Sequence, residues 1–364
     1  MRKVAIVSWA TTQFVKDSAL SVFELCCEPC TSILRTTAID KQELDAFLVS
    51  SCTTEQYSST IVSEMLGLKP KISQRVDNLC NSGTNAVANA YALIASEMCE
   101  LVLVVGAEKA DSTGNKLLWD LTRGSFMFPV HWAAIFAKAH MRKYGTTEEQ
   151  MAMVAVKNRK NASKNPNAMF RTEVTLEQVM NSRKVADPVK LLDCSAPCDG
   201  ASAVLLASER MASKLTDTPI WIEGIGQKTN SASFANATSN LTTIESAKAA
   251  ANDAYEMAQL GPDAIDVAEV HDAFTILEIL AMEDLGLQEK GSKLDVNGRL
   301  KVNTRGGILG CGHPVGATGV AQVAEISSQL AGKAGSSQVS GCRHGLVHNL
   351  AAAGSSATVM VMGR

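Results

Sequence analysis

The sequence predicts an α/β fold made of two similar halves. Three observations predict it: apolar segments of strand length alternate with helical segments, the order of these segments repeats, and an insertion interrupts the first copy. The chain has 364 residues, of which 46% are hydrophobic and 20% charged. This composition allows a large buried core and is not typical of a disordered chain. Alternating strands and helices favour sheets that are buried between helices.

The repeat begins with a β-rich segment in each half, at Val4–Val7 and at Ile220–Glu223. After a helical stretch, each half continues with an aspartate followed by an apolar run, at Asp45–Ser51 and at Asp266–Asp272. We expect these runs to be buried strands. Both halves are expected to close on apolar strands, at 101–106 and at 357–362.

A short loop leads into a small-residue helix at matching places in the two halves. Cys80-Asn-Ser-Gly-Thr precedes one helix and His313-Pro-Val-Gly-Ala precedes the other, each with glycine three residues after the first residue. Cys80 and His313 are therefore equivalent positions. If the halves pack about a pseudo-twofold axis, the two helix N-termini can face one shared site.

The insertion divides the first half. We predict a first half of residues 1–110 and 194–217, an inserted loop domain of 111–193, and a second half of 218–364. The insertion carries 13 Lys or Arg and 8 Asp or Glu, a net charge of +5 in a chain whose total is −3. This charge favours an anionic ligand such as a phosphorylated carrier, although a solvated helix face is the alternative. Its basic cluster comprises Lys157, Arg159, Lys160 and Lys164.

Several classes of protein do not fit the sequence. The apolar run at the N-terminus is too short for a signal peptide, and no apolar stretch approaches the roughly 18 residues of a membrane helix. The ending Val-Met-Gly-Arg is not a peroxisomal signal. We therefore expect a cytoplasmic protein with no membrane or nucleic-acid partner. The ten cysteines contain no second Cys-x-x-Cys or histidine pair that would complete a zinc set, so we expect no metal.

Cys80 is the first candidate for chemistry, because it lies at the expected start of a helix. A helix N-terminus presents free N–H groups and a partial positive charge that favour the thiolate, which is the attacking form. His313, in a glycine-rich loop, could take the proton of Cys80. The alternatives are an inert packing cysteine and a structural glycine-rich loop with an incidental histidine.

Two more histidines are candidates. His271 ends a predicted buried strand, a common place for functional residues in α/β sheets, although a hydrogen-bonded core histidine is the alternative. His348 is expected in a small-residue turn ahead of the last strand. Cys311 lies two residues before His313, and we expect it to be a packing residue.

These residues together resemble the thiolases, most closely the sterol-carrier-protein-type and archaeal acetoacetyl-CoA thiolases. The resemblance runs from end to end. It rests on the Cys80 loop, Tyr144-Gly-Thr-Thr-Glu-Glu-Gln, Ala155-Val-Lys-Asn, Asp199-Gly-Ala-Ser-Ala, His271-Asp-Ala-Phe, Gly312-His-Pro-Val-Gly-Ala-Thr-Gly and the final glycine-containing turn. Each motif alone is weak, but their combination is specific.

The resemblance implies a thiolase fold of two βαβαβαββ halves in a five-layered αβαβα arrangement, with the loop domain holding the nucleotide of coenzyme A. It implies that Cys80 is acylated, that His313 activates it, and that His271 helps to form an oxyanion hole. We expect backbone N–H groups of Cys80 and Leu350 to complete the oxyanion holes. The acyl-CoA thioester is then a substrate, and no metal or redox cofactor is implied.

Family members also suggest partners. We expect a homodimer or a dimer of dimers. Archaeal relatives further suggest a zinc-ribbon/OB-fold scaffold protein and a hydroxymethylglutaryl-CoA synthase.

The sequence departs from the standard pattern where thiolases carry a second cysteine that moves the α-proton. That position is His348, and the usual substitute in the His-Asp-x-Phe box is Ala273. His348 is our first candidate for this acid–base step and Cys311 is the second. The function predicted is reversible formation of a 3-oxoacyl-CoA, such as acetoacetyl-CoA. The alternatives are a decarboxylating ketoacyl-synthase-like enzyme, an acyltransferase to a non-CoA acceptor, and a non-catalytic binding or scaffold subunit. The presence of Cys80, His271 and His313 argues against the last.

Overall fold

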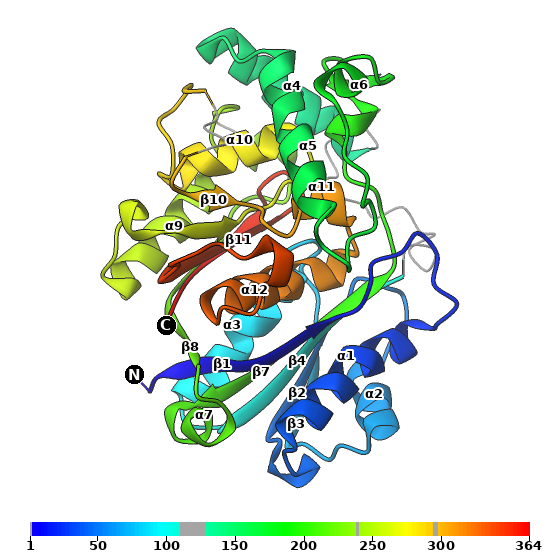
Figure 1. Cartoon of the computed structure of the whole chain (residues 1–364), viewed down its shortest axis with the longest axis vertical. Coiled ribbons are helices and arrows are strands. Elements are labelled where there is room, and N and C mark those ends of the chain that lie inside the picture. Colours follow the sequence, from blue (N-terminus) through cyan, green and yellow to red (C-terminus); the bar gives the residue numbers. More distant parts are fainter. Residues whose placement is uncertain (1, 110–127, 238–239, 294–297) are drawn as a thin grey trace.

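The structure, a computed structural model, describes residues 2–109, 128–237, 240–293 and 298–364 (Figure 1). The first half consists of β1 (Val4–Thr11), α1 (Val22–Thr37), β2 (Ala46–Ser50), α2 (Ser58–Leu66), β3 (Ile72–Val76), α3 (Ser82–Ala95), β4 (Leu101–Glu108) and β7 (Gly200–Ser208). The main elements of the second half are β8 (Ile220–Thr229), α9 (Glu245–Ala258), β9 (Val267–Glu269), α10 (Thr275–Asp284), β10 (Lys301–Val302), α12 (Val315–Leu330), β11 (His344–Ala351) and β12 (Ser356–Gly363). The predicted βαβαβαββ order is therefore confirmed in both halves.

Further short elements lie between these. They are α7 (Glu209–Leu215), α8 (Phe234–Ala237) and α11 (Gly307–Cys311). The segment between β4 and β7 contains α4 (Pro129–Tyr144), α5 (Glu148–Ala162), α6 (Leu176–Met180), β5 (Lys184–Ala186) and β6 (Val189–Lys190). Residues 111–127 of the predicted insertion lie outside the described residues, and its exact limits remain a prediction. No described helix has the length and apolar character needed to cross a membrane.

The main strands form one ten-stranded sheet in the order β10-β9-β11-β12-β8-β1-β7-β4-β2-β3. Each half supplies five strands in the same relative order, and the halves join where Ala5 and Ile6 of β1 pair with Trp221 and Ile220 of β8. One detail of the predicted repeat is wrong. The expected repeat matches β4 with β12, the strands at 101–106 and 357–362. By position in the sheet, β4 is instead equivalent to β11, and β12 is equivalent to β7. The insertion hides this match in the sequence, because it lies between β4 and β7.

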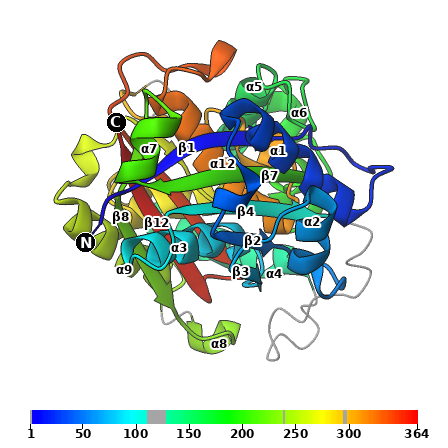
Figure 2. The same cartoon turned by 90° about the horizontal axis from the view of Figure 1, so that it is seen from below.

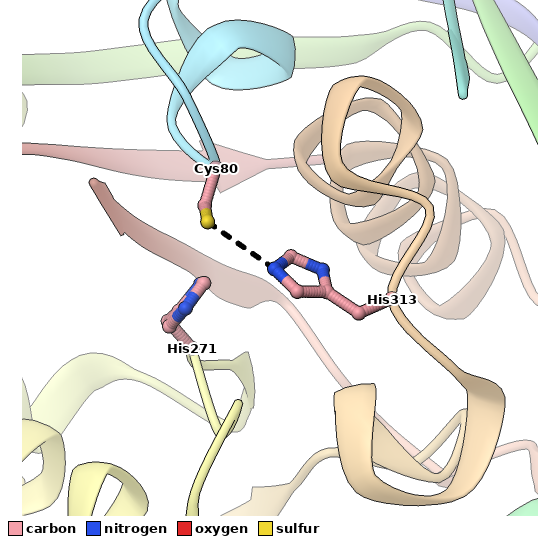
Figure 3. Close-up of side chains that lie close together, drawn as sticks. All are labelled: Cys80, His271 and His313. Carbon is pink, nitrogen blue, oxygen red and sulfur yellow. Dashed lines mark hydrogen bonds between the residues drawn. The ribbon is translucent and has the colours of Figure 1, made fainter. Parts of the chain in front are cut away.

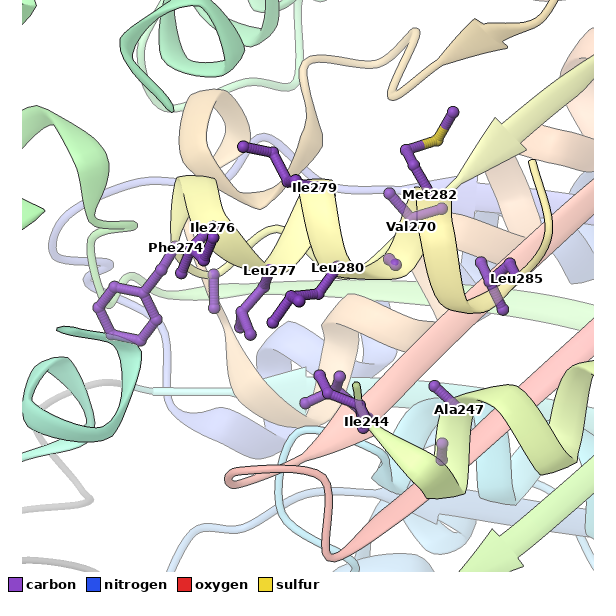
Figure 4. Packing of buried hydrophobic residues seen from close by; sticks show 14 of the residues in the cluster. Ile244, Ala247, Val270, Phe274, Ile276, Leu277, Ile279, Leu280, Met282 and Leu285 are labelled. Carbon is purple, nitrogen blue, oxygen red and sulfur yellow. The ribbon is translucent and has the colours of Figure 1, made fainter. Parts of the chain in front are cut away.

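The elements form five layers (Figures 1 and 2). Side chains alternate across each strand, so Leu101 and Leu103 of β4 pack with α1, whereas Val102 and Val104 face the central helices α3 and α12. On the far side, α9 and α10 cover the sheet of the second half (Figure 4). The order is therefore outer helices, sheet, central helices, sheet, outer helices.

The two central helices approach closely at a pair of glycines. A Cβ atom at Gly83 would lie 2.7 Å from the backbone nitrogen of Val320, and one at Gly319 would lie 2.5 Å from that of Thr84. Only residues without a side chain allow backbones to come this near. The N-terminal turns of α3 and α12 are thus held side by side.

Candidate active site

Cys80 lies two residues before the first turn of α3, as predicted, and is buried. Leu79 adopts a left-handed conformation with φ of 48°, which turns the chain sharply ahead of the cysteine. Asn78 holds this turn by donating hydrogen bonds to Asn85 Oδ1 at 2.6 Å and to Ser356 Oγ, at the start of β12, at 2.9 Å. The Cys80 loop is therefore fixed to both halves of the molecule.

His313 lies two residues before α12, and its Nε2 atom is 3.2 Å from Sγ of Cys80 (Figure 3). Its Nδ1 atom is 2.8 Å from Oγ1 of Thr318. The Thr318 hydroxyl donates its own proton to the carbonyl oxygen of Pro314 at 3.0 Å, so it accepts from His313. The proton of neutral His313 is therefore on Nδ1, which leaves the lone pair of Nε2 facing the Cys80 thiol.

A buried carboxyl group fixes the start of α12. Oε2 of Glu108, at the end of β4, accepts hydrogen bonds from the N–H of Gly316 at 2.8 Å and of Cys52 at 3.0 Å. Burial raises the pKa of Glu108 to about 7 although both bonds oppose the shift. Ser50 also donates to the carbonyl oxygen of Gly316 at 2.7 Å. The helix that carries His313 in its leading loop is thus tied to the strands of the other half.

His271 completes the group. It follows β9 by two residues, and its ring centroid lies 5.6 Å from that of His313. Figure 3 shows the side chains of Cys80, His271 and His313 converging from three separate segments. Burial lowers the pKa of His271 well below its usual value, and the neighbouring His313 and His348 add to the effect. His271 is therefore a neutral imidazole that can donate a hydrogen bond.

Burial also sets the protonation states of the reacting pair. It raises the pKa of Cys80 to about 12, although the N–H groups of Ala352 and of Cys80 itself act in the opposite direction. Burial lowers the pKa of His313 to about 4. At neutral pH the resting pair is a thiol beside a neutral imidazole.

The backbone N–H group that hydrogen-bonds to the Cys80 sulfur is not the expected N–H of Leu350. It is the N–H of Ala352, in a left-handed conformation with φ of 49°, in the turn after β11. The expected Leu350 instead lies within the β11–β12 ladder, opposite Ala357. The small residues of this turn let the backbone approach the sulfur.

His348 lies within β11 and not in a turn, since it pairs with Val359 of β12. Its Nδ1 atom accepts a long hydrogen bond of 3.4 Å from the backbone N–H of His271, while its buried Nε2 has no partner among the described residues. Burial lowers the pKa of His348 to about 3. Neutral His348 therefore carries its proton on Nε2, where it can be donated to a ligand.

Cys311, the second candidate for the acid–base step, lies in a different cluster. Its thiol donates to the carbonyl oxygen of Arg305 at 3.1 Å, and it packs with Phe14 and Cys198. Cys80, His271 and His313 form a group of three residues whose sulfur and ring nitrogen atoms all lie within 4.8 Å of one another. A thiol and two imidazoles could hold a zinc ion, but they are also the candidate nucleophile, oxyanion donor and base.

A buried polar network connects the insertion to this site. Nδ2 of Asn158 in α5 donates to Asp272 at 2.6 Å and to Glu278 at 2.8 Å. Asp272, next to His271, accepts the N–H groups of Ile308 and Leu309 in α11, at 2.6 and 3.2 Å. The network holds the His271 loop against the segment that leads to His313. Sequence reasoning missed Asn158, although it lies in the Ala155-Val-Lys-Asn motif.

The four basic residues predicted to bind the coenzyme separate into two groups. Lys157 forms a 3.0 Å ion pair with the fully buried Glu278. Arg159 stacks over Phe170 and donates to a backbone carbonyl oxygen. Lys160 and Lys164 are exposed. The last two can meet an anionic ligand, whereas Lys157 is largely occupied by the network.

Comparisons with known proteins agree with this geometry. The family model described as "Thiolase, N-terminal domain" matches residues 4–210, and the one described as "Thiolase C-terminal domain-like" matches residues 226–364. An acetyl-CoA acetyltransferase of Methanothermobacter thermautotrophicus is 38% identical, with all of both chains covered. Rabbit (Oryctolagus cuniculus) sterol carrier protein 2 is 35% identical over 82% of this chain and 60% of its own.

A solved structure is also similar. It is described as "Ltp2-ChsH2(DUF35) aldolase" and has a TM-score of 0.88 and 28% identity, covering 99% of this chain and 97% of its own. Both halves of the sequence are matched by family models, and the fold has the repeated architecture that the resemblance implied. The chain belongs to the thiolase family.

Proposed function

We propose that this protein is a thiolase-type acyltransferase that forms or cleaves a 3-oxoacyl-CoA through an acyl-Cys80 intermediate, with acetyl-CoA and acetoacetyl-CoA as its substrates. The observation that carries the proposal is the 3.2 Å contact between Cys80 Sγ and the unprotonated Nε2 of His313. The relative named acetyl-CoA acetyltransferase, which is covered over its whole length, supports the choice of substrate.

In the acyl-loading step, Sγ of Cys80 attacks the thioester carbonyl carbon as its proton passes to Nε2 of His313. The carbon–sulfur bond to coenzyme A breaks, and the departing thiolate takes that proton from His313. Both groups thus begin and end the step neutral, which suits a buried site. The N–H of Ala352 and the ring of His271 are our candidates for stabilising the oxyanions.

In the second step, another acyl-CoA loses an α-proton and its carbon attacks the acyl group on Cys80. His313 is again neutral after coenzyme A has left, so its Nε2 can accept this proton. As the carbon–carbon bond forms, the carbon–sulfur bond to Cys80 breaks, and the departing Cys80 thiolate takes the proton back from Nε2 of His313. We propose that His348 donates from Nε2 to the enolate oxygen. To act as the predicted base, His348 would need an unprotonated Nε2 and therefore a proton on Nδ1. That proton would face the backbone N–H of His271, which now donates to Nδ1.

Exposed Lys160 and Lys164 are our candidates for contacts with the phosphates of coenzyme A. We also propose a homodimer, supported by β3, which is an edge strand of the ten-stranded sheet that the described residues form and could pair with a strand of a second copy. The name of the similar solved structure pairs Ltp2 with ChsH2(DUF35), which supports a protein partner for this chain as well. A zinc-ribbon/OB-fold scaffold protein and a hydroxymethylglutaryl-CoA synthase are the candidates. A cytoplasmic location and a role in lipid or isoprenoid-precursor metabolism fit such an activity.

The decisive experiment is incubation of the protein with acetyl-CoA, followed by peptide mass mapping and an assay for acetoacetyl-CoA. We expect acetylation of Cys80 in the wild type and loss of both acetylation and product in Cys80→Ser. Acetylation of another cysteine, with Cys80→Ser still active, would contradict the proposal. Condensation of malonyl-CoA without exchange of the α-protons of acetyl-CoA would identify a decarboxylating enzyme instead.

A further inference from the structure

Arg305 is a buried cation outside the catalytic group. It precedes Gly306 and α11, and 5% of its surface is exposed. Its guanidinium group lies over the ring of Phe14, with 5.2 Å to the centroid. Its polar neighbour is the Cys311 thiol, whose pKa burial raises to about 11 although Arg305 lowers it. That thiol is neutral at physiological pH.

No carboxylate of the described ranges forms an ion pair with this guanidinium. Glu269 is fully buried, burial raises its pKa well above the usual value, and its carboxyl group accepts the backbone N–H of Arg305 at 3.2 Å. Glu325 accepts hydrogen bonds from Thr304 at 3.0 Å and Gln329 at 2.9 Å. A charge removed from water without a close partner destabilises the folded state. Among the described residues, Glu269 and Glu325 both raise the pKa of Arg305, but neither carboxylate lies within ion-pair distance of its guanidinium group.

Arg305 is one of the residues that line a cavity of about 160 Å³. At about 30 Å³ for each water molecule, this is room for about five waters. The cavity lies between β1, the loop after α5 and α12, and its polar lining includes Trp9, Asn165, Asn167, Arg305, Glu325 and Ser328. Cys80, His271, His313 and His348 are absent from the lining, so this cavity is separate from the catalytic group.

We propose that this cavity is a binding site for a small monocarboxylate, with the carboxylate paired to Arg305. The planar guanidinium fork matches the two oxygens of a carboxylate. The volume admits an acid of about two to four carbon atoms. Glu325 also lines the cavity and would repel a second negative charge, which disfavours a dicarboxylate.

A ligand at this site would brace the segment that leads to the catalytic base. The carbonyl oxygen of Arg305 accepts hydrogen bonds from Asn165 at 2.9 Å and from the Cys311 thiol at 3.1 Å. Five residues separate Arg305 from Cys311, which is the last residue of α11, and His313 follows two residues later. Fixing the guanidinium therefore holds α11 in place from its N-terminal side.

The test is titration of the full-length protein with sodium acetate, with sodium chloride as the counterpart at equal ionic strength. Two signals are followed: the melting temperature, and saturation transfer from the protein to the acetate methyl group by NMR. We expect acetate to raise the melting temperature by about 1–2 °C above chloride and to show transfer. An equal effect of acetate and chloride would overturn the proposal.

Three variants locate the site. Arg305→Gln removes the cation, and Ser328→Leu fills the cavity from a half-buried position on α12 while keeping Arg305. Both should abolish the acetate-specific shift and the saturation transfer. Cys80→Ser should keep both signals, whereas their loss would place the acetate at the catalytic cysteine and refute a separate site. Retention of binding in a folded Ser328→Leu variant would refute it equally, even if Arg305→Gln does not fold.

Discussion

Thr318 Oγ1 lies 2.8 Å from Nδ1 of His313, at the ring nitrogen that faces away from Cys80. Because the same hydroxyl donates to the carbonyl oxygen of Pro314, it can only accept from the imidazole. Thr318 thus determines which nitrogen of the base is free, and we describe it as a positioning residue that acts through His313.

The first prediction concerns this hydroxyl. Thr318→Val keeps the side-chain shape but removes the acceptor, so part of the His313 population should carry its proton on Nε2 and be unable to accept one from Cys80. We expect acyl loading from acetyl-CoA to slow by at least about tenfold. Thr318→Ser should load at a near-normal rate. Rapid-quench mass spectrometry measures both, and equal rates in Thr318→Val and wild type would show that the hydroxyl does not control the tautomer.

The second prediction is a pH profile. Burial lowers the pKa of His313 to about 4, so the imidazole stays unprotonated at mildly acidic pH. Acyl loading should therefore be nearly constant between pH 8 and 5 and should fall as pH drops through about 4, when protonation removes the proton acceptor. An exposed histidine would cause this fall near pH 6.5. Single-turnover loading measured alongside circular dichroism separates this effect from acid unfolding, and a midpoint near 6.5 would contradict the buried, neutral base.

The third prediction separates the two steps. His348→Ala should still form acetyl-Cys80 at a near-normal rate, because His348 does not contact the reacting sulfur. It should lose exchange of the α-protons of acetyl-CoA with deuterated solvent, and lose condensation, by about 10²–10³-fold, as expected for an oxyanion donor. His313→Ala should slow acyl loading itself. Exchange and condensation at wild-type rates in His348→Ala would exclude His348 from the carbon–carbon step.

The fourth prediction concerns the ion pair between Lys157 and the fully buried Glu278. Lys157→Met should lower the free energy of unfolding by about 3–5 kcal/mol, because it leaves a buried carboxylate without its cation. The double variant with Glu278→Gln should recover much of this loss. Urea unfolding followed by circular dichroism measures both, and a stability change below about 0.5 kcal/mol would show that the pair behaves as a surface contact.

The fifth prediction concerns the exposed lysines. The double substitution Lys160→Gln with Lys164→Gln should raise the KM for acyl-CoA several-fold and weaken its dependence on salt, since the phosphates lose two cations. Lys214 is an exposed lysine on α7, in the other part of the fold, and Lys214→Gln is the matched control. If the control changes KM as much as the double variant, the effect is one of net charge and not of contact.

The sequence could predict the pairing of Cys80 with His313 because both occupy equivalent positions in a repeat whose helices lie side by side. It could not reveal the surroundings of His348. Glycine, asparagine and alanine weaken the strand pattern of β11, so that segment resembled a turn until its pairing with β12 was known. The bond between Asn158 and Asp272 joins residues 114 positions apart, and no local pattern signals such contacts. The sequence places Lys157 among the ligand-binding lysines, because charge alone does not distinguish a lysine in a buried ion pair from an exposed cation.

The glycine contact between the central helices sets the distance between them, because no side chain separates the two backbones. Gly83 belongs to the helix that follows the nucleophile and Gly319 to the helix that follows the base, and the backbone of each leaves no room for a methyl group on the other. The separation of sulfur and imidazole is thus a property of the scaffold and not only of the two side chains. An alanine at either position would push the two helices apart by roughly the size of a methyl group. Such variants would show how the rate of proton transfer between thiol and imidazole depends on the distance between them.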